Sequence, residues 1–410
     1  MNILLINHYA GSPKYGMEYR PYYLAREWVR AGHCVRIVAS SESHIRMLRP
    51  NLENKQRLDE TIDGIDYSWL RTPAYGGNGA MRVRNMGSFI ASLYRDAKRL
   101  VSEQCPDVVI ASSTYTMDIW PAHHIARLAG AKLLYEVHDL WPLSPMELGG
   151  MSRWHPFIML VQRAEDYAYQ HADSVVSILP KVASYMQTRG LALHKLHLIT
   201  NGIDPAEWQC ESMEVQDEAQ TLLSNLRKSG VTIIGYAGTH GLSNALDNLI
   251  DAAILARQEQ VAFVLIGSGP EKMRLQQRVV HEKLSNVWFL DPVSKNRIPS
   301  ILRAFDIAYI GWHRHPLYRF GIAPNKLMDY MMAACPVLHA VSAGNDPVSE
   351  AQCGLTVEPD NPQALFDGIR QMLGFGIERR QMMGQRGKDF VLKNLTYPVL
   401  GKRFLAACGI

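Results

Sequence analysis

The chain has 410 residues, of which 47% are hydrophobic and 20% are charged, and its formal net charge is +4 at pH 7. This is the composition of a soluble globular protein, and the length allows two or three domains that each bury a core. No run approaches the roughly 18 to 20 apolar residues that cross a bilayer, and residues 1–6 lack a basic leader or a small-residue cleavage site, so we expect a cytoplasmic protein.

The six cysteines are scattered along the chain, and none of them forms a Cys-x-x-Cys pair. Each lies in an apolar or ordinary segment, which favours free buried thiols over a disulfide framework or a zinc site. We therefore expect free, buried thiols at Cys34, Cys105, Cys210, Cys335, Cys353 and Cys408.

In the first half, short runs of Val, Ile and Leu alternate with longer amphipathic stretches. This alternation is typical of parallel strands joined by helices. The predicted strands are residues 3–7, 35–39, 65–70, 108–111, 132–137, 174–178 and 196–199, and the predicted helices include 22–30, 119–128 and 157–169.

A loop with two glycines follows the first predicted strand. Gly11 and Gly16 are five residues apart, so the loop cannot be the dinucleotide fingerprint, whose glycines stand at tight fixed offsets. Tyr15 and Glu18 could line a polar cleft, but a plain strand-to-helix connection explains the loop equally well.

All of the excess positive charge lies in residues 1–200, and part of it surrounds the apolar stretch 86–93. Such a segment can dock on anionic lipid headgroups, but a charge run is also typical of a solvated helix face. The basic residues concerned are Arg71, Arg82, Arg84, Arg95, Lys98 and Arg99.

His138 and Asp139 directly follow the predicted strand 132–137, and Trp141-Pro142 then breaks the pattern. Polar groups at the carboxyl end of a buried parallel strand are candidates for contact with a reacting group. A structural role for the histidine is the alternative.

Turn residues interrupt the pattern at Asn201-Gly202-Ile203-Asp204-Pro205, which marks a candidate domain boundary. A second series of strands follows, at residues 232–236, 262–266, 287–290, 307–310, 336–339 and 355–357. The sequence thus predicts two tandem doubly wound α/β domains, residues 1–203 and 204–390, with ligands in the cleft between them. We expect residues 391–410 to pack back on the first domain.

Two glycine-bearing turns of the second half each follow a strand and precede a helix. The first comprises Gly238, Thr239, His240 and Gly241, and its backbone amides could approach phosphate oxygens at the start of a helix over residues 246–257. The second contains Gly267 and Gly269, but Lys272 stands where a third glycine would complete a Rossmann fingerprint, so a nicotinamide site is weakly supported.

Residues 321–334 carry the most informative pattern. Pro324 suits the first turn of a helix, which we expect to begin near Asn325. Lys326 adds a full charge to the positive helix end, and Asp329 shares that face, so the segment could hold a diphosphate. A buried core helix with a surface lysine is the alternative.

These segments, in this order, resemble the glycosyltransferases of family 4, which are retaining enzymes with two Rossmann-like domains facing across a cleft, the GT-B fold. The helix start Pro-Asn-Lys-Leu-x-Asp-Tyr-Met is most similar to the N-acetylfucosamine transferase-like branch of bacterial surface-polysaccharide enzymes.

The resemblance implies a role for each matching residue. Lys326 and the loop 238–241 would hold the diphosphate of a nucleotide sugar, Asp329 the ribose hydroxyls, and His138 with Asp139 the reacting sugar. Further donor contacts are implied at Asn201, Gly267, Gly269, Gly321, Ile322 and Asn325, and acceptor contacts at Gly11, Tyr15, Gly16 and Glu18.

Two positions depart from the family pattern. Gly321 stands where the first family glutamate would lie, so we expect the backbone amides of Gly321 and Ile322 to replace that side chain. Asn244 lies where a basic residue often follows the phosphate loop, so Lys326 and the backbone would bear more of the diphosphate charge.

The resemblance implies transfer of a sugar, such as an N-acetylated hexosamine or deoxyhexosamine, from UDP to a lipid-linked saccharide in O-antigen (lipopolysaccharide) or capsule synthesis. No metal-binding motif or P-loop occurs in the sequence, so we expect neither metal nor cofactor. Peripheral contact with the inner face of the plasma membrane would use Arg82, Arg84, Arg95, Lys98 and Arg99. A non-hydrolysing nucleotide-sugar epimerase and a non-catalytic nucleotide-sugar-binding subunit are the alternatives.

Overall fold

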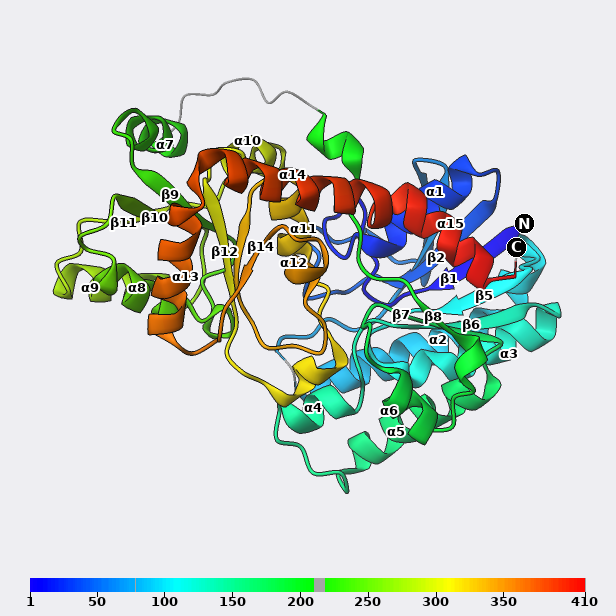
Figure 1. Cartoon of the computed structure of the whole chain (residues 1–410). Helices are drawn as coiled ribbons and strands as arrows, with labels where there is room; N and C mark the ends of the chain where they lie inside the picture. The colour runs from blue at the N-terminus through cyan, green and yellow to red at the C-terminus, as the bar shows by residue number, and fades with distance from the viewer. Residues whose placement is uncertain (78, 210–217, 410) are drawn as a thin grey trace. The chain divides into compact units, whose positions relative to one another are not determined.

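A computed structural model describes residues 1–77, 79–209 and 218–409 of the chain (Figure 1). The chain divides into two compact units, Met1–Asn201 with Tyr397–Ile410, and Gly202–Thr396. Each unit is a Rossmann-like α/β layer structure, so the predicted fold class is confirmed.

The first unit is built on an eight-stranded sheet with the order β3-β4-β2-β1-β5-β6-β7-β8. All neighbouring strands are parallel except β3, which is antiparallel to β4. The strands are β1 (Asn2–Ile6), β2 (Cys34–Ser40), β3 (Arg57–Ile62), β4 (Ile65–Leu70), β5 (Val108–Ala111), β6 (Lys132–Val137), β7 (Ser174–Ser177) and β8 (Leu196–Leu198).

Strand β3 is the one strand of this unit that the sequence pattern does not predict. Its sequence Arg-Leu-Asp-Glu-Thr-Ile is largely polar, because it lies at the edge of the sheet and its residues are mostly half-buried or exposed. It forms a hairpin with β4 through Asp63 and Gly64, both of which have positive φ.

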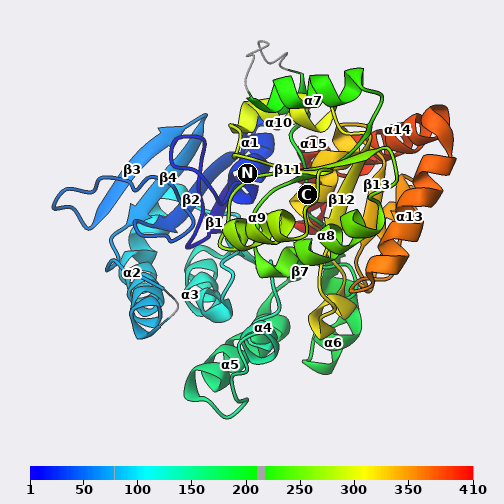
Figure 2. The same ribbon diagram turned by 90° about the vertical axis from the view of Figure 1, so that its left-hand side faces the viewer.

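Helices cover both faces of this sheet. α1 and α15 pack together over one face, and α2, α3 and α5 cover the other (Figure 2). The helices are α1 (Arg20–Arg30), α2 (Ala80–Gln104), α3 (Ile119–Ala129), α4 (Leu143–Glu147), α5 (Pro156–His171), α6 (Ala183–Thr188) and α15 (Tyr397–Ala407).

Helix α15 belongs to the first unit although it follows the second unit in sequence. Tyr397 stacks on Tyr23 with 4.6 Å between ring centroids, and Phe404 packs on Trp28 at 5.1 Å. The indole N–H of Trp28 also donates to the carbonyl of Gly401 at 3.2 Å. The helix therefore completes the core around Trp28.

The second unit has a fully parallel six-stranded sheet with the order β11-β10-β9-β12-β13-β14. Two cores lie on opposite faces of this sheet, one under α7, α10, α11 and α14 and the other under α8, α9 and α13. The strands are β9 (Thr232–Ala237), β10 (Val261–Ile266), β11 (Val287–Leu290), β12 (Ile307–Gly311), β13 (Val337–Ala340) and β14 (Gly354–Thr356); the helices are α7 (Glu218–Lys228), α8 (Leu246–Leu255), α9 (Lys272–His281), α10 (Ile298–Leu302), α11 (Asn325–Met332), α12 (Pro347–Glu350), α13 (Pro362–Gly374) and α14 (Gly376–Asn394).

The five described cysteines are free, as predicted, and Cys335, Cys353 and Cys408 are buried. Cys34 and Cys105 are exposed, so the prediction of burial is wrong for them. Cys34 is the first residue of β2 and Cys105 caps the end of α2, and both places are open to solvent. Cys210 lies outside the described residues.

Over the described ranges, no helix is long and apolar enough to cross a membrane.

Candidate functional site

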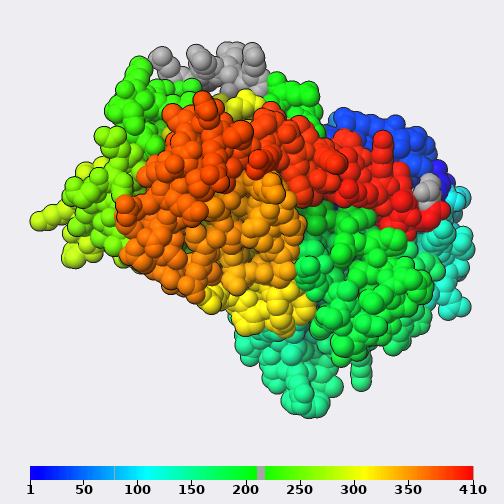
Figure 3. All heavy atoms as spheres, in the orientation of Figure 1, coloured from blue at the N-terminus to red at the C-terminus, as the bar shows by residue number. Residues whose placement is uncertain are grey.

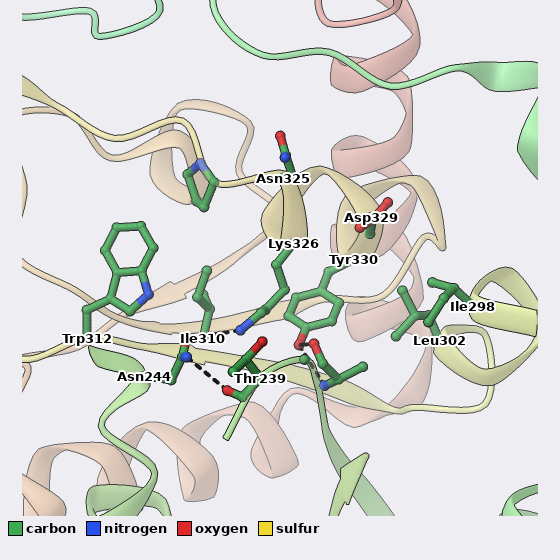
Figure 4. Close-up of a pocket in the computed structure, with 13 residues that line it drawn as sticks. Thr239, Asn244, Ile298, Leu302, Ile310, Trp312, Asn325, Lys326, Asp329 and Tyr330 are labelled. Carbon is green, nitrogen blue, oxygen red and sulfur yellow. Dashed lines mark hydrogen bonds between the residues drawn. The ribbon is translucent and has the colours of Figure 1, made fainter. Parts of the chain in front are cut away.

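A cavity of about 450 Å³ opens at the carboxyl ends of β9 and β12 in the second unit (Figure 4). The loop after β9, the helix α10, the residues after β12 and the first turn of α11 supply its walls. They are Ala237, Gly238, Thr239, Asn244, Ile298, Leu302, Ile310, Trp312, Pro324, Asn325, Lys326, Asp329 and Tyr330.

Lys326 supplies the positive charge in this wall. Its ammonium donates to the hydroxyl of Tyr236 at 2.8 Å and to Oδ1 of Asn244 at 3.1 Å, and it lies 4.1 Å from the centre of the Tyr236 ring. Within the described part of the chain, no carboxylate lies within ion-pairing distance of it. Burial lowers the pKa of Lys326 to about 8. The cavity therefore presents a cation that has neutral partners and can accept an anion.

The loop after β9 is shaped around that lysine. The hydroxyl of Tyr236 and the amide of Asn244 both donate to the carbonyl of Thr239, at 2.7 and 2.9 Å. Gly238 has φ of +150°, and a Cβ atom there would lie 2.7 Å from Cε and 2.9 Å from Nζ of Lys326. Glycine at this position therefore leaves the space that the lysine occupies.

Gly267 and Gly269 let the two glycine-bearing turns approach each other closely. A Cβ atom on Gly267 would lie 2.0 Å from the carbonyl oxygen of Gly238, and one on Gly269 would lie 2.4 Å from that of His240. The amide of His240 donates to Ser268 at 2.8 Å. Gly241, Gly267 and Gly269 are not among the residues that line the cavity, and neither is His240.

His240 is fully buried, and its two ring nitrogens have no hydrogen-bond partner among the described residues. Burial, with the nearby charges of Lys272 and Lys326, lowers its pKa to about 4. The imidazole is therefore neutral at pH 7 and does not add to the positive charge near the cavity.

The start of α8, which the sequence suggests as a phosphate contact, does not line this cavity. A 3₁₀ turn, Leu242–Asn244, stands between the loop and the helix, and Ala245 in the left-handed conformation precedes Leu246. This turn brings the side chain of Asn244 to the cavity, while the first residues of α8 stay outside its lining. Of the two predicted helix starts, the one at α11 lies at the cavity.

Helix α11 begins at Asn325, as predicted, but Pro324 precedes the helix in an extended conformation and does not form its first turn. In Figure 4, Lys326 extends from α11 toward Asn244 and Thr239, whereas Asn325 extends from another side of the helix. Asp329 lines the cavity one turn further on. Burial raises the pKa of Asp329 to about 7.

The expected role of the amides before α11 is not supported by their geometry. The amide of Gly321 donates to the carbonyl of Tyr318 at 2.9 Å, and the amide of Ile322 donates to Oδ1 of Asn345 at 2.7 Å. Both donors are therefore engaged within the protein. A ligand would have to displace these partners before either amide could replace the family glutamate.

In the first unit, His138 joins a buried charged network. Its Nε2 lies 3.0 Å from the hydroxyl of Ser112 and 3.3 Å from Oε2 of Glu136. Glu136 also accepts from Nε of Arg20 at 2.9 Å, and both side chains of that pair are 1% exposed. Burial alone would raise the pKa of Glu136, but Arg20 and His138 together lower it to about 2. His138 itself is 14% exposed and stays accessible at the end of β6.

Asp139 is hydrogen-bonded within its own turn. Its Oδ1 accepts from the amide of Leu140 at 2.9 Å and from the hydroxyl of Ser144 at 2.6 Å. These bonds fix the turn that leads into α4. Asn201, the last residue of this segment of the first unit, is not among the residues that line the cavity at Lys326.

The loop after β1 is tightly closed on itself. The amide of Gly11 donates to Glu18 at 2.8 Å, that of Gly16 donates to Ser12 at 2.8 Å, and a Cβ atom on Gly11 would lie 1.9 Å from the carbonyl oxygen of Gly16. Tyr15 is buried, and its hydroxyl donates to Glu60 at 2.7 Å. Tyr15 therefore packs in the core, while Glu18 remains half-buried.

The basic residues from Arg82 to Arg99 lie on α2. Its apolar residues Met86, Phe89 and Leu93 are buried against the sheet, so the apolar stretch is not available for contact with lipid. Arg95 pairs with Asp96, and Arg99 pairs with Glu103 at 2.6 Å. Arg84 and Lys98 are exposed, and Arg82 donates to the hydroxyl of Tyr9. Arg71 lies outside the helix and donates to backbone carbonyls.

Several residues of the cavity were not predicted from the sequence. Ile298, Leu302, Ile310 and Trp312 line it and look like ordinary core residues in the sequence. Tyr236, which holds the ammonium of Lys326, lies inside a predicted strand. The position of Trp312 directly after a strand is the one signal that could have identified it. Among the described residues, no group of three or more His, Cys, Asp or Glu side chains could hold a metal ion.

Comparison with protein-family models gives two matches. Residues 15–202 match a glycosyl transferase 4-like domain, and residues 231–374 match the glycosyl transferases group 1. Among curated proteins, the chain is similar to the putative colanic acid biosynthesis glycosyl transferase WcaI of Escherichia coli (strain K12), with 25% identity over 257 residues, 61% of this chain. The chain spans 62% of the length of that relative.

Two solved structures share the fold over the whole length. Sucrose-phosphate synthase (tll1590) from Thermosynechococcus elongatus has a TM-score of 0.72 at 15% identity, covering 99% of this chain and 98% of that one. Anabaena Alr3699/HepE in complex with UDP has a TM-score of 0.69 at 15% identity, covering 100% of both chains.

Proposed function

Because the chain belongs to the group 1 glycosyltransferase family with the GT-B fold, we propose that it transfers a sugar from a UDP-linked donor to a hydroxyl of a lipid-linked saccharide. The observation that carries this proposal is the cation of Lys326, which faces a cavity beside the Gly238 loop and the start of α11. A diphosphate is a ligand of matching charge for this arrangement.

In this proposal, Lys326 and the Gly238–Thr239 loop hold the diphosphate, and Asp329 accepts hydrogen bonds from the ribose. Negative charge develops on the β-phosphate as the bond to the sugar breaks, so Lys326 stabilises the transition state more than the bound donor. The base lies toward the apolar wall made by Ile298 and Leu302. The name of the Anabaena complex supports UDP as the nucleotide.

His138 and Asp139 are proposed to contact the transferred sugar, with the loop that contains Gly11, Gly16 and Glu18 on the acceptor side. The Glu136 carboxylate and the hydroxyl of Ser112 orient the imidazole of His138. We propose that the departing phosphate takes the acceptor proton and that the sugar keeps its anomeric configuration, without a metal ion.

The acceptor is proposed to be an intermediate of a bacterial surface polysaccharide. Support comes from the name of the Escherichia coli relative, which assigns it to colanic acid biosynthesis. Lipid-linked intermediates lie in the membrane surface, where Arg84 and Lys98 on the exposed side of α2 would meet anionic headgroups. Sedimentation with anionic vesicles tests this contact, and equal pelleting with neutral vesicles would exclude it.

A non-catalytic nucleotide-sugar-binding subunit is the second candidate. The missing acidic side chain at Gly321 and the engaged amides of Gly321 and Ile322 favour it. Measurement of free UDP separates the two functions: a transferase releases UDP only when donor and acceptor are both present, whereas a binding subunit releases none.

Two further measurements on the reaction test metal independence and retention of configuration. A transferase that needs no metal keeps its rate in EDTA, and the anomeric proton coupling of the product, read by NMR, reports whether configuration is retained. An epimerase would instead convert the nucleotide sugar into its epimer without an acceptor.

A further inference from the structure

A second cavity, of about 390 Å³, lies in the first unit between the start of α2, helix α4 and the start of α5. Most of its walls are apolar. The residues that line it are Arg82, Val83, Met86, Asp139, Trp141, Ser144, Pro145, Leu148, Gly149, Met151 and Phe157. Such walls favour a hydrocarbon over a sugar or a nucleotide.

The mouth of this cavity is lined by exposed apolar side chains. Leu148 is 63% exposed and Val83 is 42% exposed, although both line the cavity. Trp154, in the same connection between α4 and α5, is 69% exposed and lies under the guanidinium of Arg153 at 4.7 Å. This connection projects at the lower edge of the first unit in Figures 1 and 3. Exposed apolar residues grouped around an apolar cavity are typical of a binding surface.

Few polar groups enter the cavity. Asp139 is already held by the amide of Leu140 and the hydroxyl of Ser144. Arg82 donates to the hydroxyl of Tyr9 at 3.3 Å and lies 5.6 Å from its ring. It places a cation in a lining whose other polar side chains are Asp139 and Ser144. A ligand that fits this lining has a hydrocarbon chain next to an anionic group.

The cavity also adjoins the strand end that we assign to the transferred sugar. Asp139 lines it, and His138 directly precedes Asp139 at the end of β6. A lipid chain in the cavity would therefore hold its attached headgroup near His138.

We propose that this cavity binds the first part of the hydrocarbon chain of a lipid-linked acceptor, with the phosphate of that lipid at Arg82. The inference rests on the proposed transferase function, because it assigns the lipid to the acceptor. The exposed basic residues of α2 would meet anionic headgroups of any lipid. The cavity would in addition select a hydrocarbon chain together with its phosphate.

Calorimetric titration with octyl, decyl and dodecyl phosphate, each below its critical micelle concentration, tests the proposal. Each added methylene that enters the cavity should tighten binding about fourfold, and the gain should stop once the cavity is full. The Arg82→Gln variant should bind dodecyl phosphate no more tightly than it binds dodecanol, because the cation that meets the phosphate is gone.

Two variants at the mouth change the cavity at exposed positions. Val83→Trp should fill the entrance, and Leu148→Asp should place a charge in it, so each should weaken binding of dodecyl phosphate at least tenfold. Val280→Asp is the matched control, because Val280 is 77% exposed on α9 of the second unit. Circular dichroism melting confirms that each variant is folded.

If both mouth variants bound dodecyl phosphate within twofold of the wild-type affinity, the proposal would be overturned. It would also be overturned if the protein bound anionic vesicles but did not bind single-chain phosphates. These results are independent of the transferase assay. If affinity did not depend on chain length while the protein still released UDP in the transferase assay, only this inference would fail. If the protein bound alkyl phosphates but released no UDP, the proposed function would fail.

Discussion

Lys326 is a half-buried cation whose closest partners are the ring and hydroxyl of Tyr236 and the side-chain amide of Asn244. Such partners hold an ammonium in place but do not neutralise it, so the field of the lysine remains available to a ligand. An anion that arrives at the cavity does not have to displace a carboxylate first. The side chain is thus positioned before the donor binds.

Removal of this charge should slow the reaction strongly. We expect Lys326→Ala to raise the barrier measured by kcat/KM by about 2–4 kcal/mol, because the charge on the departing phosphate loses its main partner. Lys228→Ala, at an exposed lysine of the same unit, should leave the rate unchanged. Equal rates for wild type and Lys326→Ala would remove the role proposed for this residue.

The affinity for UDP should depend on pH through the same group. Burial lowers the pKa of Lys326 to about 8, so the lysine is charged below this pH and loses its proton above it. UDP binding should therefore weaken as pH rises through 8, by up to about 1.4 kcal/mol per pH unit. Isothermal titration at several pH values measures the effect.

Two variants separate Lys326 from its neighbour Asp329, whose pKa is raised to about 7 by burial. Lys326→Arg should flatten the loss above pH 8, because a guanidinium stays charged there. Asp329→Asn should keep that loss. A flat profile in the wild type would contradict the assignment.

Arg20 is the residue on which the charged network of the first unit depends. It shares a buried ion pair with Glu136 and also donates to the carbonyls of Ile199 and Thr200. Arg20→Ala would leave Glu136 buried without its cation, so we expect a loss of about 3–5 kcal/mol in the free energy of unfolding in urea. Arg30→Ala, at an exposed arginine of the same helix, should cost far less.

This pair also sets a pH dependence. Since the folded pKa of Glu136 is lowered to about 2, its contribution to stability is present above the unfolded pKa and is lost as pH falls through the folded value. An Arg20→Ala protein that lost no stability would show that the pair is not required.

At the scale of elements, the loop after β9 can pack against the Lys326 side chain of α11 because residue 238 is a glycine. Gly238→Ala would place a methyl group within 3 Å of the Lys326 side chain, at a φ of +150° that alanine rarely adopts. We expect this variant to bind UDP at least tenfold more weakly, measured by isothermal titration. If UDP affinity were unchanged, the lysine would not need this space.

Gly87 provides the control for that substitution. It lies inside α2, and nothing lies within 4 Å of a Cβ atom built on it. Gly87→Ala should therefore stabilise the protein by about 0.4–1 kcal/mol and leave UDP binding intact.

The elements that the sequence predicts well are those whose pattern is set by burial on both faces. The central strands β1, β5, β9, β10 and β12 are runs of apolar residues, and their predicted bounds lie within one residue of the structure. Strand β3 was missed because an edge strand alternates with polar residues and resembles a loop. The 3₁₀ turn before α8 was missed because its purpose is seen only in the structure, where Asn244 accepts a hydrogen bond from Lys326.

For the site, the residue types were easier to predict than their tasks. Lys326 and Asp329 lie on the cavity as the helix spacing predicts, because three residues along a helix return to the same face. Gly267 and Gly269 have equally suggestive spacing, yet their task is close backbone contact between two loops. A glycine pattern alone cannot distinguish an approach to phosphate from an approach to another chain segment.

At the scale of the whole molecule, the first unit is built from two separate segments of the chain, whereas the second is one continuous segment. The first unit needs α15, whose Phe404 and Leu400 are fully buried in the same core as Trp28. Phe404→Ala should therefore lower the free energy of unfolding by about 3–5 kcal/mol, seen as a lower urea midpoint in tryptophan fluorescence. Leu392→Ala, at a 40% exposed leucine of α14, is the matched control and should shift the midpoint little.

The return of α15 to the first unit has a consequence for biosynthesis. Translation of the intervening segment Gly202–Thr396 takes roughly 10 to 40 s at about 5–20 residues per second. During that time the aromatic side chains of α1 that contact α15, Tyr23 and Trp28, lack their covering helix. The nascent first unit therefore leaves the ribosome with an open apolar face, and a chaperone that shields such faces would find its substrate there.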